Sequence, residues 1–205
     1  MTRPHVRLPG AGTPLLLLHG TGGDEHDLLP LREHLAPGAP VLAPRGLVLE
    51  NGMPRFFRRL AEGVLDEDDL RLRVDELADF VLGVDAGPWV AVGFSNGANT
   101  ASAMLMRRPE VLAGAVLLAA MVPFRDGPPL LDGREVDLTG KRVAVSNGRH
   151  DPLVDLAQTA ELVAQLRGCG AEVEEFPHDG GHGIDAAVLP RIRAFLAGAI
   201  SPGGR

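Results

Sequence analysis

Residues 89–97 read Trp-Val-Ala-Val-Gly-Phe-Ser-Asn-Gly, a short apolar run that ends in a serine between two glycines. The run has the length and composition of a buried β-strand, and residues 96–108 that follow favour a helix. A serine at such a strand–helix junction stands on a sharp turn with its hydroxyl exposed, and the flanking glycines leave room for the neighbouring strand and helix. Ser95 is therefore the candidate nucleophile, and the segment favours an α/β fold.

The same alternation of strand and helix extends in both directions from this turn. Short apolar runs buried on both faces predict a mostly parallel central sheet, and amphipathic stretches predict helices that cover both of its faces. The predicted strands are residues 14–19, 40–44, 89–94, 114–120, 142–147 and 171–176. The predicted helices are residues 25–36, 68–84, 96–108, 153–167 and 184–199. Sites in such folds form in the loops beyond the carboxyl ends of the strands.

Two stretches, residues 45–67 and 121–139, fit neither the strand nor the helix period, and we interpret them as short lid insertions. The candidate walls of an acyl pocket are Phe56, Phe57, Val122 and Phe124. If the two adjacent phenylalanines are lid core instead, the wall is expected in residues 121–139. Neither an internal repeat nor a shift in composition marks a second domain, so residues 1–205 are expected to form a single domain.

Composition excludes several classes of protein. The chain has 205 residues, a formal net charge of −7 and 20 basic side chains, of which only Lys141 is a lysine. No basic stripe could neutralise a phosphate backbone, so nucleic-acid binding is disfavoured. The longest early apolar run, residues 15–18, is too short for a signal peptide or a membrane span. Because the single cysteine, Cys169, allows no internal disulfide either, we expect a cytoplasmic protein, and the sequence leaves open whether it forms a homodimer.

A serine hydroxyl reacts only when a histidine accepts its proton and a carboxylate orients that histidine. Asp151 follows the predicted strand 142–147 and directly precedes a helix, which suits the orienting acid. His182 lies after the last strand between two glycines that free the backbone to present its ring, whereas His178 is the alternative base. Together with Asp179 the two histidines could instead bind zinc, but they lack a third ligand with recognisable spacing, so no metal is expected.

An acyl-transfer site also needs two hydrogen-bond donors for its oxyanion. The donors are expected to be the backbone N–H groups of Asn96, which follows the nucleophile, and of Thr21, in the loop after the first strong strand. That loop contains Gly20-Thr21-Gly22-Gly23, and His19 is expected to support it. Because the glycines have neither a dinucleotide-binding spacing nor a lysine, they do not predict a phosphate cradle, and no cofactor is expected.

Four motifs together resemble the α/β-hydrolase superfamily over residues 14–199: Leu18-His19-Gly20, Gly93 to Gly97, Asp151-Pro152 and Gly181-His182. Their order and spacing are similar to those of the phospholipase/carboxylesterase and acyl-protein thioesterase enzymes. Within that group, residues 43–46 and 50–57 are more similar to bacterial hydrolases associated with hydroquinone resistance. The thioesterases usually carry Ser-Gln where this chain has Ser95-Asn96.

The resemblance implies an α/β-hydrolase fold in which Ser95, Asp151 and His182 form a catalytic triad and Thr21 and Asn96 are the oxyanion donors. The expected function is that of a cofactor-independent serine carboxylesterase that cleaves short- to medium-chain esters of small molecules through an acyl-enzyme. One alternative is a thioesterase or lysophospholipase with the same triad and a longer groove. An alternative of a different class is a non-catalytic ligand-binding protein on a hydrolase scaffold.

Three arginines in the first of the two unusual stretches allow a further interpretation. Arg55, Arg58 and Arg59 could attract an acidic leaving group of the substrate. The acidic run of residues 66–69 lies close in sequence, however, and could simply pair with all three.

Overall fold

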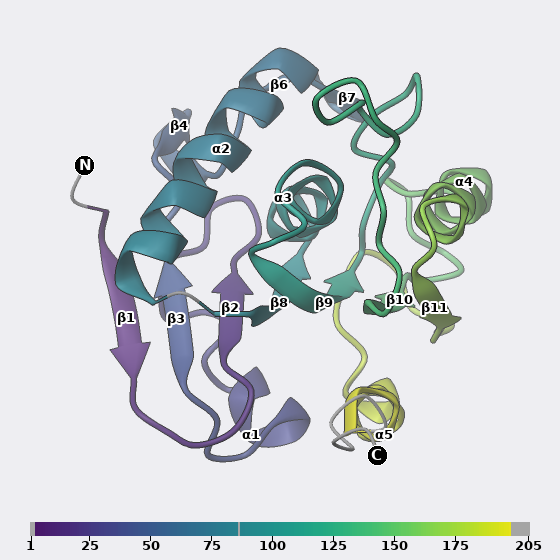
Figure 1. Ribbon diagram of the computed structural model, residues 1–205. Helices are drawn as coiled ribbons and strands as arrows, with labels where there is room; N and C mark the ends of the chain where they lie inside the picture. Colours follow the sequence, from purple (N-terminus) through teal and green to yellow (C-terminus); the bar gives the residue numbers. More distant parts are fainter. Residues whose placement is uncertain (1–2, 86, 198–205) are drawn as a thin grey trace.

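The computed structural model describes residues 3–85 and 87–197, which are built around a seven-stranded sheet (Figure 1). The strand order is β1-β3-β2-β8-β9-β10-β11. Only β1 runs antiparallel to its neighbour, so the prediction of a mostly parallel sheet is confirmed. The strands are β1 (His5–Leu8), β2 (Leu15–Leu18), β3 (Val41–Pro44), β8 (Trp89–Phe94), β9 (Leu112–Leu118), β10 (Arg142–Ser146) and β11 (Glu172–Glu175).

Helices cover both faces of this sheet (Figure 1). One face packs against α1 (Leu31–Leu35) and α5 (Leu189–Ala197), and the other against α2 (Glu67–Val84), α3 (Asn96–Arg107) and α4 (Leu156–Gly168). Because successive strand residues point to opposite faces, β2 contributes to both cores. Leu15 and Leu17 pack with α1 and α5, whereas Leu16 and Leu18 pack with α2 and α3. An unbroken run of leucines is therefore what a central strand of this sheet requires.

Several helices begin or end at other residues than the sequence predicts. The helix predicted over residues 25–36 begins only at Leu31, because residues 25–30 form successive turns. The helix predicted from 153 begins at Leu156, where the Asp155 carboxylate accepts the N–H of Gln158 at 2.7 Å and caps its first turn. A short 3-10 helix, η1 (Ala186–Val188), precedes α5, and residues 198–199 of that predicted helix lie outside the described residues.

The two stretches that fit neither period differ in their local structure. Residues 45–67, the first insertion, form two small hairpins, β4 (Val48–Glu50) with β5 (Met53–Arg55) and β6 (Arg59–Ala61) with β7 (Val64–Leu65). The turn between β4 and β5 is Asn51-Gly52, and both residues have the positive φ that a two-residue hairpin turn favours. Residues 121–139, the second insertion, are irregular apart from one isolated bridge between Leu131 and Arg134.

No helix in residues 3–85 and 87–197 has both the length and the apolar character needed to span a membrane.

Candidate active site

Ser95 lies at the junction of β8 and α3, on the edge of the sheet where the parallel strands end. Its φ of 51° and ψ of −114° are unusual for a residue with a side chain, and this is the geometry of a nucleophile elbow. The flanking glycines are required, because a Cβ at Gly93 would collide with the backbone of Gly97 and a Cβ at Gly97 would collide with that of Leu18. The Ser95 N–H donates to Leu118 O at 2.8 Å, which fixes the turn to β9.

The structure brings three of the predicted side chains together. Ser95 Oγ lies 2.8 Å from His182 Nε2, and His182 Nδ1 lies 2.7 Å from Asp151 Oδ2. The Asp151 side chain is fully buried, and its second oxygen accepts the N–H groups of Leu153 at 2.8 Å and Val154 at 3.2 Å. Two backbone donors and one imidazole therefore hold this carboxylate in a single orientation.

This geometry selects one hydrogen-bonding pattern for the histidine. A carboxylate only accepts, so Nδ1 of His182 carries the hydrogen that reaches Asp151, and Nε2 is left to accept the Ser95 hydroxyl. His178, the alternative base, is buried elsewhere, and its Nδ1 accepts the N–H of Gly180 at 3.2 Å. Of these two histidines, His182 is the one that lies within hydrogen-bonding distance of the Ser95 hydroxyl.

Thr21 and Asn96, the predicted oxyanion donors, both line the cavity at Ser95. Within the described parts of the chain, neither backbone N–H donates to another backbone group, so both remain available to a ligand. The loop that contains Thr21 is fixed on either side of it, since Gly22 N–H donates to Pro54 O at 2.9 Å and Gly23 N–H donates to Gly20 O at 3.2 Å.

The first insertion contacts both predicted donor segments through buried side chains. His19 Nδ1 lies 2.6 Å from Gly20 O, and its Nε2 accepts the N–H of Gly46 at 2.9 Å, which fits the expected support of the loop. Burial lowers the pKa of His19, which keeps the ring in the neutral form that this pairing needs. The side chain of Asn96 accepts the N–H of Phe56 at 2.7 Å. Sequence reasoning missed this role of the Asn96 side chain, because the partner lies 40 residues away.

The cavity at Ser95 has a volume of about 220 Å³. Its lining residues are Thr21, Arg55, Arg59, Glu62, Gly63, Leu65, Phe94, Ser95, Asn96, Asn99, Ala119, Met121, Leu153 and His182.

The predicted acyl-pocket residues do not line this cavity, which corrects the expectation. Phe56, Phe57 and Phe124 are at most 3% exposed and belong to the core cluster that α2, α3 and α4 cover. Full burial of these large rings removes more apolar area from water than a place on a cavity wall would. Val122 lines a neighbouring hollow with Met121 and Pro123. The apolar part of the wall beside Ser95 is formed instead by Leu65, Phe94, Ala119, Leu153 and, from the second insertion, Met121.

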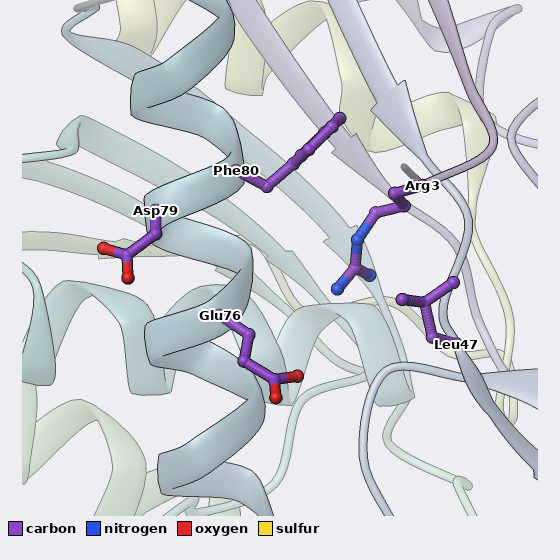
Figure 2. Close-up of a pocket in the computed structure, with 5 residues that line it drawn as sticks. All are labelled: Arg3, Leu47, Glu76, Asp79 and Phe80. Atoms are coloured by element: carbon purple, nitrogen blue, oxygen red, sulfur yellow. The ribbon is translucent and has the colours of Figure 1, made fainter. Parts of the chain in front are cut away.

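A second cavity, of about 330 Å³, lies beside α2 and is lined by Arg3, Leu47, Glu76, Asp79 and Phe80 (Figure 2). Figure 2 shows Arg3 extending from the start of the chain toward α2. Its Nη1 donates to Arg45 O at 3.0 Å, and burial lowers the pKa of its guanidinium to about 10. None of the predicted catalytic residues lines this cavity, so it is separate from the site at Ser95.

Within residues 3–85 and 87–197, three potential metal ligands converge only at Asp24, Glu25 and His26. Glu25 of this group pairs with Arg45. The zinc ligands considered from the sequence, His178 and His182, do not belong to it.

Comparison with known proteins places these observations in a family. No family model matches the chain. The chain is 45% identical to a Bacillus subtilis (strain 168) protein named "Putative hydrolase MhqD", over 91% of this chain and 93% of that protein. The structure matches a Bacillus cereus carboxylesterase with a TM-score of 0.90 and 41% identity, over 97% of this chain and 95% of the other. It also matches YahD, solved with malic acid, with a TM-score of 0.87 and 28% identity, over 97% and 100% of the two chains.

Proposed function

The chain belongs to the phospholipase/carboxylesterase family of α/β-hydrolases, and from this premise we propose that it hydrolyses carboxylic esters with Ser95, His182 and Asp151 as its catalytic triad. The observation that carries the proposal is the unbroken chain of hydrogen bonds from Ser95 Oγ through His182 to Asp151, with distances of 2.8 and 2.7 Å. A ligand-binding protein would not need this alignment, whereas acyl transfer does.

In the acylation step, Ser95 Oγ attacks the carbonyl carbon of the ester while its proton passes to His182 Nε2. The carbonyl oxygen becomes an oxyanion, which the backbone N–H groups of Thr21 and Asn96 stabilise. Asp151 holds the imidazolium in place without taking up its proton. When the tetrahedral intermediate collapses, the bond to the alcohol oxygen breaks and His182 returns the proton to the departing alcohol.

In the deacylation step, water takes the place of the alcohol. His182 accepts a proton from water as its oxygen attacks the acyl carbon, and the same two N–H groups bind the second oxyanion. Collapse of this intermediate releases the carboxylic acid and returns the proton to Ser95 Oγ. The cycle restores every group on the protein, so it needs neither a metal nor an organic cofactor.

The size of the cavity supports a preference for short acyl chains. Its volume of about 220 Å³ lies below the range of about 300–1,000 Å³ that is typical of sites for larger ligands. Each methylene that an apolar pocket accepts contributes about 0.8 kcal/mol, so kcat/KM is expected to rise over the first few carbons and then to stop rising or fall. Lysophospholipids, with their long acyl chains, are therefore expected to be poor substrates.

Covalent labelling tests the nucleophile. A fluorophosphonate probe is expected to label the wild-type protein at Ser95 and to leave the Ser95→Ala variant unlabelled. Ester hydrolysis by the same variant should fall by about 10⁴–10⁶-fold, because the members of a triad act as a unit. Wild-type turnover in a folded Ser95→Ala protein would rule out the mechanism. A screen of esters of increasing chain length, with matched thioesters and lysophospholipids, then separates the esterase from its alternatives.

The two histidines offer a matched test of the base. His182→Ala is expected to lose as much activity as Ser95→Ala, because it removes the proton acceptor that lies 2.8 Å from the hydroxyl. His178→Ala should retain far more activity, because the His178 ring contacts Gly180 instead. The assignment is reversed if His178→Ala is inactive while His182→Ala turns over normally.

A further inference from the structure

Two of the three arginines of the first insertion lie at the site and one does not. Arg55 and Arg59 line the cavity together with Ser95 and His182. Arg58, although adjacent in sequence, is 63% exposed and pairs with Asp66 at 3.1 Å and Asp69 at 3.7 Å. The acidic run therefore accounts for Arg58 alone, and the other two guanidinium groups need a separate explanation.

One carboxylate is shared by both cavity arginines. Arg55 Nη1 lies 2.8 Å from Glu50 Oε2, and Arg59 Nε and Nη2 each lie 2.9 Å from Glu50 Oε1. Glu50 is not among the residues that line the cavity, so its carboxylate holds the two guanidinium groups from outside the cavity wall. Two positive charges balanced by one negative charge leave one unit of positive charge in this cluster.

Burial makes this charge effective. The Arg55 side chain is only 5% exposed, and its Nε donates to Phe57 O at 3.1 Å, which fixes the plane of the guanidinium. Charges interact more strongly where water is excluded than in bulk solvent. Glu62, whose carboxylate does belong to the cavity lining, is exposed, so its field is screened by water. His182 also lines the cavity, and it is paired with Asp151.

On the basis of the proposed esterase function, we infer that Arg55 and Arg59 select esters that carry a carboxylate close to the bond that is cleaved. Half-esters of short dicarboxylic acids are the simplest members of this class. Glu50 and Phe57 leave Nη2 of Arg55 and Nη1 of Arg59 to donate charge-assisted hydrogen bonds to a substrate carboxylate. One surplus positive charge matches one carboxylate better than a doubly charged phosphate monoester. The same cavity dimensions that limit the acyl chain keep the carboxylate of such a substrate near the arginines.

The experiment measures the ratio of kcat/KM for charged and neutral esters of equal length. On the acyl side, monoethyl half-esters of dicarboxylic acids are compared with ethyl esters of monocarboxylic acids. On the alcohol side, O-acetyl derivatives of hydroxy acids are compared with alkyl acetates. The wild-type protein is expected to prefer the charged ester in at least one of the two series, and the preference should weaken as the salt concentration rises.

The variants assign that preference to particular residues. Arg59→Gln should lower the charged-to-neutral ratio about 10-fold to 100-fold, the effect of losing one charge-assisted hydrogen bond. Arg58→Gln changes the net charge by the same amount and should leave the ratio unchanged, because Arg58 does not line the cavity. Glu50→Gln should raise the ratio, because it removes the charge that opposes the arginines. Arg55→Lys, which keeps the positive charge in the buried position, should lower the ratio through loss of the fork geometry.

The outcomes separate this inference from the proposed function. A wild-type protein that hydrolyses neutral esters, with the same ratio in wild type, Arg59→Gln and Glu50→Gln, overturns the inference and leaves the esterase intact. A wild-type protein that hydrolyses no ester and is not labelled by fluorophosphonate at Ser95 overturns the proposed function itself. An equal loss of the ratio in Arg58→Gln and Arg59→Gln would show a general effect of net charge and would also overturn the inference.

Discussion

The first and second insertions, residues 45–67 and 121–139, have similar lengths and lie beside the same cavity, yet they contact the site in different ways. The first insertion hydrogen-bonds to both predicted oxyanion segments, through Gly46 to His19, Pro54 to Gly22 and Phe56 to Asn96. The second insertion hydrogen-bonds to α3 near the site, where Met121 N–H donates to Asn99 Oδ1 at 2.8 Å.

Other hydrogen bonds of the second insertion are made to α4 and α2. Phe124 is buried, its carbonyl accepts a hydrogen bond from Gln165 of α4 at 3.0 Å, and the N–H of Arg125 donates to Glu67 of α2. The comparison teaches that the first insertion holds the proposed backbone donors by hydrogen bonds and lines the cavity through Arg55, Arg59 and Leu65, whereas the second lines it through Met121. Both insertions therefore contribute to the wall of the cavity, and the first also holds the segments of the proposed donors.

Among the variants that test this comparison, the largest effect is expected in the loop that the first insertion holds. Thr21→Pro removes the N–H proposed to bind the oxyanion, and hydrolysis should fall by about 10²–10³-fold. Thr21→Ala keeps the N–H and should retain most activity. Steady-state kinetics measure both, and circular dichroism with a melting temperature near that of the wild type shows that the proline variant is folded. Full activity in a folded Thr21→Pro protein would remove Thr21 from the mechanism.

Two asparagines on α3 compare the insertions directly, since each accepts one backbone N–H. Asn96→Ala leaves Phe56 N–H unpaired beside the second oxyanion donor, and kcat is expected to fall about 10-fold to 100-fold with a much smaller change in KM. Asn99→Ala leaves Met121 N–H unpaired. Its free energy of unfolding should fall by about 1–3 kcal/mol, and its loss of kcat should be smaller than that of Asn96→Ala. Equal losses of kcat in the two variants would contradict the division of roles.

The wall contributed by the second insertion is tested by chain length. Met121→Ala should move the optimum toward longer acyl chains and change kcat/KM for them by a few-fold per added methylene, in line with about 0.8 kcal/mol each. Val122→Ala is the control, because Val122 faces the neighbouring hollow. The assignment of the wall fails if both variants keep the wild-type chain-length profile.

The smallest expected effect is on the pH dependence of stability. Burial lowers the pKa of His19 below its ordinary value of 6.5. Just below pH 6.5, His19 is therefore protonated in the unfolded chain but stays neutral in the native protein. The stability associated with neutral His19 is present above pH 6.5 and is lost as the pH falls below that value, with a slope of at most about 1.4 kcal/mol per pH unit. Urea unfolding between pH 7.5 and 5.5 should show a shallower dependence in His19→Gln. An identical dependence in both proteins would show that this histidine does not titrate with unfolding.

Most of the strands and the turn at Ser95 follow from local sequence patterns. The leucines of β2 and the apolar residues of β8 predict buried central strands, and Gly93 to Gly97 predicts the turn that the structure shows, because both depend on residues close in the chain. The positions of Ser95, Asp151 and His182 at strand ends also predict their convergence. That they form the catalytic triad, with Thr21 and Asn96 as oxyanion donors, stays a proposal.

Other features depend on contacts between distant residues and were not predictable. Which residues line the cavity depends on which aromatic rings are buried in the core. Apolar residues without a clear period do not indicate whether a ring is buried or lines a cavity. The edge strand β1 has only four residues of alternating exposure, which is a weak signal on its own. Arg55 and Arg59 both pair with Glu50. The hairpin of β4 and β5 brings Arg55 to Glu50, and this pairing could not be read from the sequence.

The close contact of Gly93 and Gly97 with neighbouring backbone limits how this protein can be re-engineered. Any side chain at either position would collide with main-chain atoms that cannot move aside without disturbing β2 or α3. A mutant library aimed at new substrates should therefore keep the turn constant and place its diversity at Leu65, Met121 and Leu153, whose side chains face the cavity from other segments. Ser95→Cys is the informative exchange within the turn, because it preserves the backbone and replaces only the nucleophilic atom.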